Sequence, residues 1–149
     1  MNIRALTGRF SVGDGAPDAA EIADIKAQGF SAIVSLRNGG EPGEVMAPDE
    51  QGAAVEAAGM TWLHFPMAAP MVGEIDPTDD LSRRLQDLPA PILIHCASGA
   101  RAAGIAVGIC AVGENWDLET AAQKINDAGI ALPPALAPKV AAYIQAKRG

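Results

Sequence analysis

The stretch that decides the fold is Pro91-Ile92-Leu93-Ile94-His95-Cys96-Ala97-Ser98-Gly99-Ala100-Arg101. Its first four residues are apolar and lead into His95, and together these five residues predict a β-strand buried on both faces, as in a parallel sheet. The four residues after Cys96 are small, so the backbone can turn tightly around a ligand there. A helix is predicted over residues 102–112, with its start near Arg101. In open sheets with alternating helices, ligands bind where strands end, so we expect a functional site at Cys96.

The loop after Cys96 has the properties of an anion-binding site. The helix that follows points its free backbone N–H groups and the positive end of its dipole into the loop. Arg101 can bind an oxyanion through two parallel hydrogen bonds, which lysine cannot do. The same positive groups favour the nucleophilic thiolate form of a cysteine. We therefore predict that Cys96 and Arg101 are catalytic, and that the substrate-binding residues of the loop are Ala97, Ser98, Gly99 and Ala100.

The other cysteine and the two histidines have plainer interpretations. The competing interpretation of Cys96 itself is a buried structural cysteine, a common role for this residue type. Cys110 lies among apolar residues of the predicted helix and is expected to pack in the core. Strand alternation turns the side chain of His95 away from that of Cys96, so we expect it to orient the loop rather than transfer a proton. His64 is expected to be a core or edge histidine of its strand.

The rest of the chain alternates predicted strands with predicted helices. Glycine, proline and charged residues separate these segments, and no repeat or low-complexity block interrupts them. This alternation predicts a three-layer α/β/α fold with a mainly parallel sheet, a helical C-terminal third, and a single domain over residues 1–149. The predicted strands cover residues 3–12 (one or two short strands bent at Gly8), 32–36, 61–65 and 91–95. The predicted helices cover residues 17–28, 49–58, 102–112, 117–128 and 134–147, with another opening at Asp76-Pro77.

Composition excludes several classes of function. The 149 residues carry a net charge of -7, which disfavours binding to nucleic acid or to an anionic membrane. No apolar run approaches the length of a membrane span, and the start of the chain has no apolar segment of the kind found in a secretory signal. The two cysteines suit a reduced, cytoplasmic protein. No group of His, Cys and Asp residues has metal-ligand spacing, so we expect neither a metal nor another cofactor.

The nucleophile segment from His95 to Arg101 resembles that of cysteine-dependent protein phosphatases. More closely, the chain resembles the bacterial beta-lactamase-hydrolase-like phosphatase family, a branch of the dual-specificity-type phosphatases. The resemblance covers about residues 1–112 and includes Ile3-Arg4-Ala5-Leu6-Thr7 and Gly40-Glu41-Pro42-Gly43. It implies a phosphatase-like fold and a phosphocysteine on Cys96. It also implies that Arg37 and Glu41 line the mouth of the site, with Arg37 as a substrate-binding residue. The alternative for Arg37 and Glu41 is a solvated surface pair.

The chain departs from the phosphatase pattern in three ways. Only four residues separate Cys96 from Arg101, as in rhodanese-type sulfurtransferases, whereas standard phosphatases have five. The residue after the arginine is Ala102, where phosphatases usually carry Ser or Thr. The loop over residues 65–73 contains no acid, although relatives place their proton donor there. The nearest candidates for a catalytic acid are Glu74 and Asp76, and Asp76 is equally suited to cap the helix that begins beside it.

Three functions remain open from the sequence. The first is a cysteine-dependent phosphatase that acts on a phosphorylated protein or a small aryl phosphate. The second is a rhodanese-like sulfurtransferase, in which Cys96 takes a sulfur atom from a thiosulfate-like donor and passes it on as a persulfide. The third is a non-catalytic module that binds anions in the same loop. The resemblance favours the phosphatase, while the short loop and the missing acid favour the other two.

Overall fold

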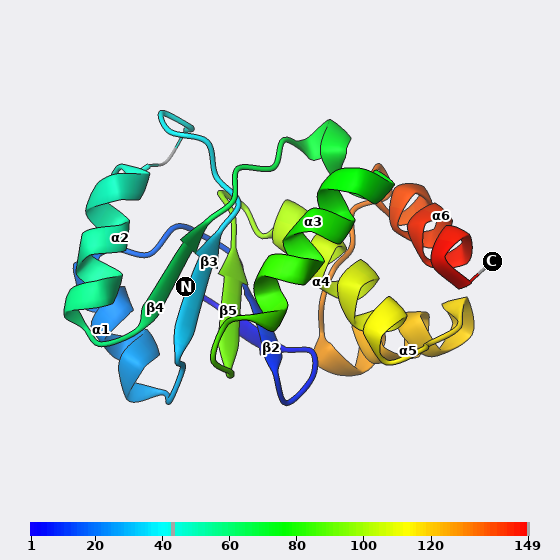
Figure 1. The fold of residues 1–149 in the computed structure, drawn as a ribbon, viewed down its shortest axis with the longest axis horizontal. Coiled ribbons are helices and arrows are strands. Elements are labelled where there is room, and N and C mark those ends of the chain that lie inside the picture. Colours follow the sequence, from blue (N-terminus) through cyan, green and yellow to red (C-terminus); the bar gives the residue numbers. More distant parts are fainter. Residues whose placement is uncertain (43, 149) are drawn as a thin grey trace.

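The computed structural model describes residues 1–42 and 44–148. Its centre is a sheet in the order β1-β2-β5-β3-β4, in which β1 is antiparallel to β2 and the other neighbours are parallel. Helices cover both faces of this sheet, with α1 and α2 on one face and α3 to α6 on the other (Figure 1). This confirms the predicted three-layer fold and its helical C-terminal third. The strands are β1 (Ile3–Ala5), β2 (Phe10–Gly13), β3 (Ala32–Ser35), β4 (Thr61–His64) and β5 (Ile92–His95).

The helices match the sequence prediction to within a few residues. Helix α1 begins with a capping box, in which Asp18 accepts from the Glu21 backbone N–H and Glu21 accepts from the Asp18 backbone N–H. The helices are α1 (Ala19–Ala27), α2 (Pro48–Ala57), α3 (Ile75–Gln86), α4 (Ala100–Gly113), α5 (Leu118–Ala128) and α6 (Ala137–Arg148), with a 3-10 turn, η1, at Ala69–Met71.

Two details of these helices differ from the sequence prediction. Helix α3 begins at Ile75, one residue before the predicted opening at Asp76, and the side chain of the preceding Glu74 makes no capping bond. Proline fits the first turn of a helix because the backbone N–H groups there have no helical partner, so Pro77 does not fix the first residue. The turn η1 lies inside the segment over residues 66–73, which was predicted to be a loop.

The central strands bury both of their faces. All four residues of β3 and of β5 are buried. Along β5, Ile92 and Ile94 pack into the core beneath α3 to α6, whereas Leu93 packs beneath α1 and α2. His95 follows the same alternation and reaches α2, while Cys96 packs on the α4 side. The sheet therefore separates the side chains of the two consecutive residues, as the strand pattern predicted.

The strand order creates a switch point where β5 ends. The chain passes from β2 to β3 through α1 on one face of the sheet, and returns from β4 to β5 through α3 on the other face. Strand β5 lies between β2 and β3. Its carboxyl end therefore lies between the connection that crosses one face of the sheet and the connection that crosses the other. Ligand sites of open α/β sheets form at this kind of position. The loop after β5 therefore lies where the fold itself favours binding.

Helix α6 is fixed to the rest of the domain by buried contacts and one polar cluster. Gly104 and Gly108 of α4 allow the approach of α6, because a Cβ at Gly108 would lie 3.2 Å from the ring of Tyr143. The hydroxyl of Tyr143 donates to Asp79 of α3 at 2.6 Å, and the ammonium of Lys147 donates to the other oxygen of that carboxylate at 2.7 Å. These contacts hold the C-terminal helix against the layer that supports the nucleophile loop.

Candidate active site

The nucleophile loop runs from Cys96 to Arg101, between the end of β5 and the first turn of α4. Gly99 has a φ of 91°, and a Cβ there would lie 2.9 Å from the Cα of Asp14. Only glycine suits both this backbone conformation and this close approach. With the chain turned in this way, the backbone N–H of Gly99 donates to the sulfur of Cys96 at 3.1 Å. The loop thus directs a backbone donor at the thiol, and its small residues allow the tight turn that this requires.

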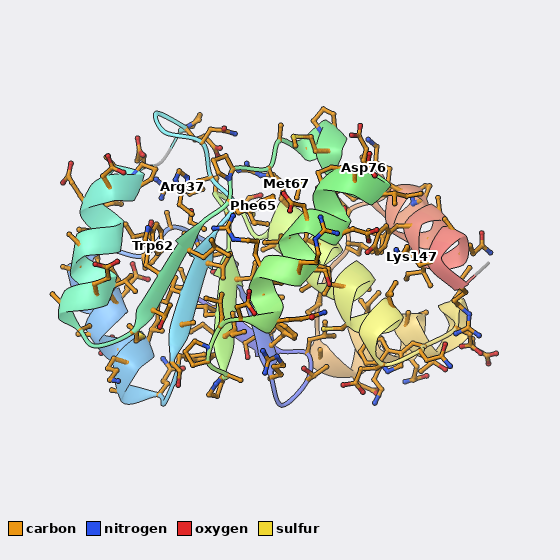
Figure 2. All side chains as sticks on the ribbon, viewed as in Figure 1. Arg37, Trp62, Phe65, Met67, Asp76 and Lys147 are labelled. Carbon is orange, nitrogen blue, oxygen red and sulfur yellow. The ribbon has the colours of Figure 1, made fainter. Side chains whose placement is uncertain are left out.

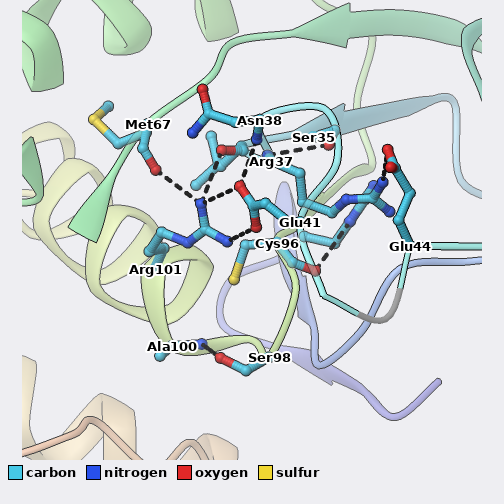
Figure 3. Close-up of polar contacts among 12 residues, drawn as sticks. Ser35, Arg37, Asn38, Glu41, Glu44, Met67, Cys96, Ser98, Ala100 and Arg101 are labelled. Carbon is cyan, nitrogen blue, oxygen red and sulfur yellow. Dashed lines mark hydrogen bonds and ion pairs between the residues drawn. The ribbon is translucent and has the colours of Figure 1, made fainter. Parts of the chain in front are cut away.

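Cys96 itself is completely buried, and it is not part of a disulfide. Its sulfur lies between the guanidinium of Arg101 and the turn that carries Ser98 and Ala100 (Figure 3). Ser98 is exposed at the tip of that turn, and its hydroxyl oxygen lies 3.5 Å from the backbone N–H of Ala100. A group bound above the sulfur would therefore be surrounded by the turn on one side and by Arg101 on the other.

Arg101 is held by Glu41, which comes from the loop after β3. The two terminal nitrogens of the guanidinium donate to the two carboxylate oxygens, at 3.0 Å for Nη1 to Oε2 and 2.5 Å for Nη2 to Oε1. Nη1 also donates to the backbone oxygens of Met67 and Leu36. The hydrogen bond with Glu41 raises the pKa of Arg101, and Arg101 lowers the pKa of Glu41 to about 2. The pair is therefore charged on both sides at any physiological pH.

This contact leaves one edge of the guanidinium available. An arginine has five N–H donors, and Glu41 together with the two carbonyls takes those that point away from the side-chain stem. Within the described residues, Nε and the second hydrogen of Nη2 make no hydrogen bond to an oxygen, and Arg101 interacts on this side with the Cys96 thiol. These two donors lie side by side and match the spacing of two oxygens of a phosphate or sulfate. Glu41 thus orients Arg101 and leaves it able to bind an oxyanion.

His95 supports the loop from the opposite face of the sheet. Its Nε2 lies 2.7 Å from the amide nitrogen of Gln51 on α2, and its Nδ1 lies 3.4 Å from the backbone oxygen of Cys96. If the Gln51 amide donates, Nδ1 carries the proton and can donate to Cys96. Burial lowers the pKa of His95 to about 4, so the ring is neutral near pH 7. A neutral, fixed ring suits the predicted orienting role better than proton transfer.

The structure places Arg37 differently from Glu41. Arg37 is only 1% exposed, and its Nη2 donates to Glu44 at 2.9 Å and to the backbone oxygen of Met46 at 3.1 Å. Its side chain extends toward Glu44 (Figure 3). The alternative of a solvated Arg37–Glu41 surface pair is wrong, because the two side chains bind different partners and Arg37 is buried. His64 lies in strand β4, as expected, and its Nε2 contacts the backbone oxygen of Arg37 at 2.6 Å.

The two candidate acids lie at the start of α3. Glu74 and Asp76 are exposed, and neither side chain makes a hydrogen bond within the described residues. In the view of Figure 2, Met67 lies between Arg37 and Asp76, and Asp76 is on the side of helix α6. The carboxylate that does contact the loop is that of Glu41. The family resemblance implied that Glu41 lines the mouth of the site, but it did not indicate the pairing with Arg101. Glu41 accepts from Arg101 and so does not hold a proton for a leaving group.

The described part of the chain contains no metal-binding group of three or more His, Cys, Asp or Glu residues. Within the same residues, no helix is both long and apolar enough to cross a membrane.

Cys110 is buried in α4, as predicted, and burial raises the pKa of its thiol to about 12. The Cys110 thiol therefore stays protonated near neutral pH.

Comparison with known proteins assigns the family. A model of the phosphatase-like domain of beta-lactamase hydrolase-like proteins matches residues 2–112. The chain belongs to this family. Beta-lactamase hydrolase-like proteins of Agrobacterium fabrum and Xylella fastidiosa are 32% and 28% identical to this phosphatase-like domain, over 77% and 68% of its length. Those alignments cover 26% and 23% of the relatives, so the domain spans about a quarter of their length.

Solved structures with the same fold are phosphatase-like. A DUF442 protein of Shewanella putrefaciens has a TM-score of 0.71 at 17% identity, over 99% of this domain and 93% of that chain. TpbA of P. aeruginosa, solved as a variant in complex with phosphotyrosine, has a TM-score of 0.67 at 18% identity, over 97% and 83%. At these identities the likeness shows the fold, and it confirms the predicted phosphatase-like architecture.

Proposed function

We propose that this domain is a cysteine-dependent phosphatase that hydrolyses aryl phosphomonoesters through a phosphocysteine on Cys96. The observation that carries the proposal is the buried sulfur, which accepts from the Gly99 N–H and lies beside the free edge of Arg101. Family membership and the phosphotyrosine complex of TpbA support a phosphate monoester as the substrate. Ser98 and the backbone N–H groups of residues 97–100 would surround the phosphoryl oxygens.

The reaction has two steps. In the first, the Cys96 thiolate attacks phosphorus, an S–P bond forms, and the bond to the leaving oxygen breaks. The free edge of Arg101 and the loop amides bind the non-bridging oxygens, where negative charge is held. In the second step, water attacks phosphorus and releases phosphate and the thiolate. Glu41 is an ion-pair partner of Arg101, and the side chains of Glu74 and Asp76 make no hydrogen bond among the described residues. The leaving group therefore takes its proton from water, and substrates with acidic leaving groups should react fastest.

The phosphocysteine itself is the most direct test of this mechanism. Intact-mass measurement after rapid acid quench of an aryl phosphate reaction should show a gain of one phosphoryl group, mapped to the peptide that contains Cys96. The variant Cys110→Ser should show the same gain, because that thiol is buried elsewhere in α4. A protein that releases phosphate while Cys96→Ser releases it equally fast would sink the proposal.

A rhodanese-like sulfurtransferase is the second candidate. Two observations favour it: the four-residue loop offers a small cradle, and the exposed side chains of Glu74 and Asp76 make no hydrogen bond among the described residues. In that reaction the Cys96 thiolate attacks the outer sulfur of thiosulfate, an S–S bond forms, and sulfite leaves with the bonding pair. The departing sulfite needs no proton donor. A mass gain of one sulfur atom on Cys96 after exposure to thiosulfate, with no phosphate release from aryl phosphates, would select this candidate.

A further inference from the structure

A cavity of about 280 Å³ lies beside the nucleophile loop and has no role in the chemistry described above. It is bounded by three segments: the loop and first turn of α4, the β1–β2 hairpin, and the chain between α5 and α6. Strands β1 and β2 lie on one side of β5, whereas Glu41 and Met67 follow β3 and β4 on the other. The cavity thus opens on the flank of the loop opposite the Arg101–Glu41 pair. Its lining includes Asn2, Arg4, Asp14, Ser98, Gly99 and Ile130.

The cavity contains one cation and one anion that do not neutralise each other. Arg4 makes no hydrogen bond or ion pair within the described residues, and its guanidinium lies over Gly129, where a Cβ would be 3.3 Å from Nη1. Asp14 accepts from the backbone N–H of Asn2 at 2.8 Å and from the Asn2 amide at 2.9 Å. A carboxylate has about four lone-pair sites, so Asp14 retains acceptor capacity toward the cavity. Arg4 and Asp14 therefore present opposite charges across one space.

Arg4 differs from the other arginines near the site because it has no carboxylate partner among the described residues. Arg101 is paired with Glu41, and Arg37 with Glu44. With a net charge of -7, the protein as a whole repels anions, and an anionic group is attracted only where a cation acts locally. Asp14 makes a simple anion a poor fit for this cavity. A ligand that carries both charges satisfies both residues.

We propose that this cavity binds the zwitterionic end of a free amino acid substrate, whose carboxylate pairs with Arg4 and whose ammonium pairs with Asp14. Part of the remaining wall is apolar and includes Val12, Ala103 and Pro133, which can contact the carbon atoms of the ligand. Gly99 lines the cavity and also donates to the Cys96 sulfur, which makes the two sites adjacent. Because the cavity is proposed as a substrate subsite, this assignment rests on the proposed function of Cys96.

Binding measurements test this without turnover. The folded Cys96→Ser protein is titrated with O-phospho-L-tyrosine, phenyl phosphate and L-tyrosine, and the backbone amides are followed by NMR. Phosphotyrosine should bind about three- to tenfold more tightly than phenyl phosphate, the range of one or two partly exposed ion pairs. It should also shift the amides of residues 129–131, and L-tyrosine should shift the same amides.

Variants separate the subsite from general charge effects. Arg4→Gln and Asp14→Asn should each abolish the preference for phosphotyrosine, whereas Arg84→Gln, which removes an exposed arginine from α3, should keep it. Equal affinity for the two phosphates, or a preference that survives in Arg4→Gln, would overturn the subsite. L-tyrosine carries no phosphate, so shifts at residues 129–131 that depend on Arg4 support the subsite even if Cys96 hydrolyses nothing.

Discussion

Glu41 binds both terminal nitrogens of Arg101 and leaves the Nε edge of the guanidinium without an oxygen partner among the described residues. The contact joins residues 60 positions apart, from the loop after β3 and the first turn of α4. It converts a flexible side chain into a fixed one, and so removes part of the entropy that an anion would otherwise have to overcome on binding. The proposed chemistry depends on that orientation.

The first prediction concerns Glu41→Gln. The amide keeps one acceptor for Arg101 but loses the charge and the second oxygen, so the guanidinium should lose its fixed orientation. We expect kcat for an aryl phosphate to fall about tenfold, equivalent to about 1.4 kcal/mol. Glu56→Gln, an exposed change on α2, is the matched control and should leave kcat unchanged. If Glu41→Gln keeps the kcat of the wild type, the Arg101–Glu41 pair has no part in catalysis.

The second prediction uses the pKa of Glu41, which Arg101 lowers to about 2. A carboxyl whose pKa is lower in the folded state than in the unfolded state stabilises the fold above its unfolded pKa, and this contribution is lost as the pH falls. For Glu41 the loss should run from about pH 4.5 to pH 2. Because the pair is partly exposed, the amount should be on the order of 1 kcal/mol. Urea midpoints measured across this range should fall less steeply in Glu41→Gln than in wild type.

The third prediction concerns His95, whose pKa is lowered by burial to about 4. The unfolded chain takes up a proton near pH 6.5, whereas the folded protein resists it until about pH 4. Stability contributed by the neutral ring is therefore complete above pH 6.5 and is lost as the pH falls toward 4, by on the order of 3 kcal/mol. His95→Gln should flatten the urea midpoint between pH 6.5 and 4. An unchanged slope in that variant would assign the dependence to other groups.

The fourth prediction concerns Gly99→Ala. The added Cβ would lie 2.9 Å from the backbone of Asp14, at a φ of 91°. The strain should lower the free energy of unfolding by about 1–3 kcal/mol and disturb the donor to the Cys96 sulfur. Gly15→Ala is the control, since a Cβ there meets nothing within 4 Å. Gly99→Ala should have a lower thermal unfolding temperature and a lower kcat than Gly15→Ala. Equal values in the two variants would contradict the close packing of this turn.

The sequence predicted most of the fold because the strands and helices leave local patterns. The apolar run before Cys96, the small residues after it and the alternation of strand and helix patterns are all readable over a few positions, and the structure confirms the elements they predict. The cap offered for Asp76 was wrong, because α3 begins one residue earlier. The contacts that organise the site are not local. Gln51 meets His95 across 44 positions and Glu41 meets Arg101 across 60, and neither pair has a periodicity that reveals its partner. The burial of Arg37 could not be predicted from the sequence, because a charged residue in a polar loop is usually solvated.

The measurement that tests the central claim most directly is phosphate release from a small aryl phosphate between pH 5 and 8, by wild type and by Cys96→Ser. A folded Cys96→Ser protein and a Cys110→Ser control keep the comparison specific to the nucleophile. The proposal predicts turnover by wild type and by Cys110→Ser, with no detectable turnover by Cys96→Ser. Silence from all three folded proteins, or equal rates from wild type and Cys96→Ser, would contradict phosphate transfer through Cys96.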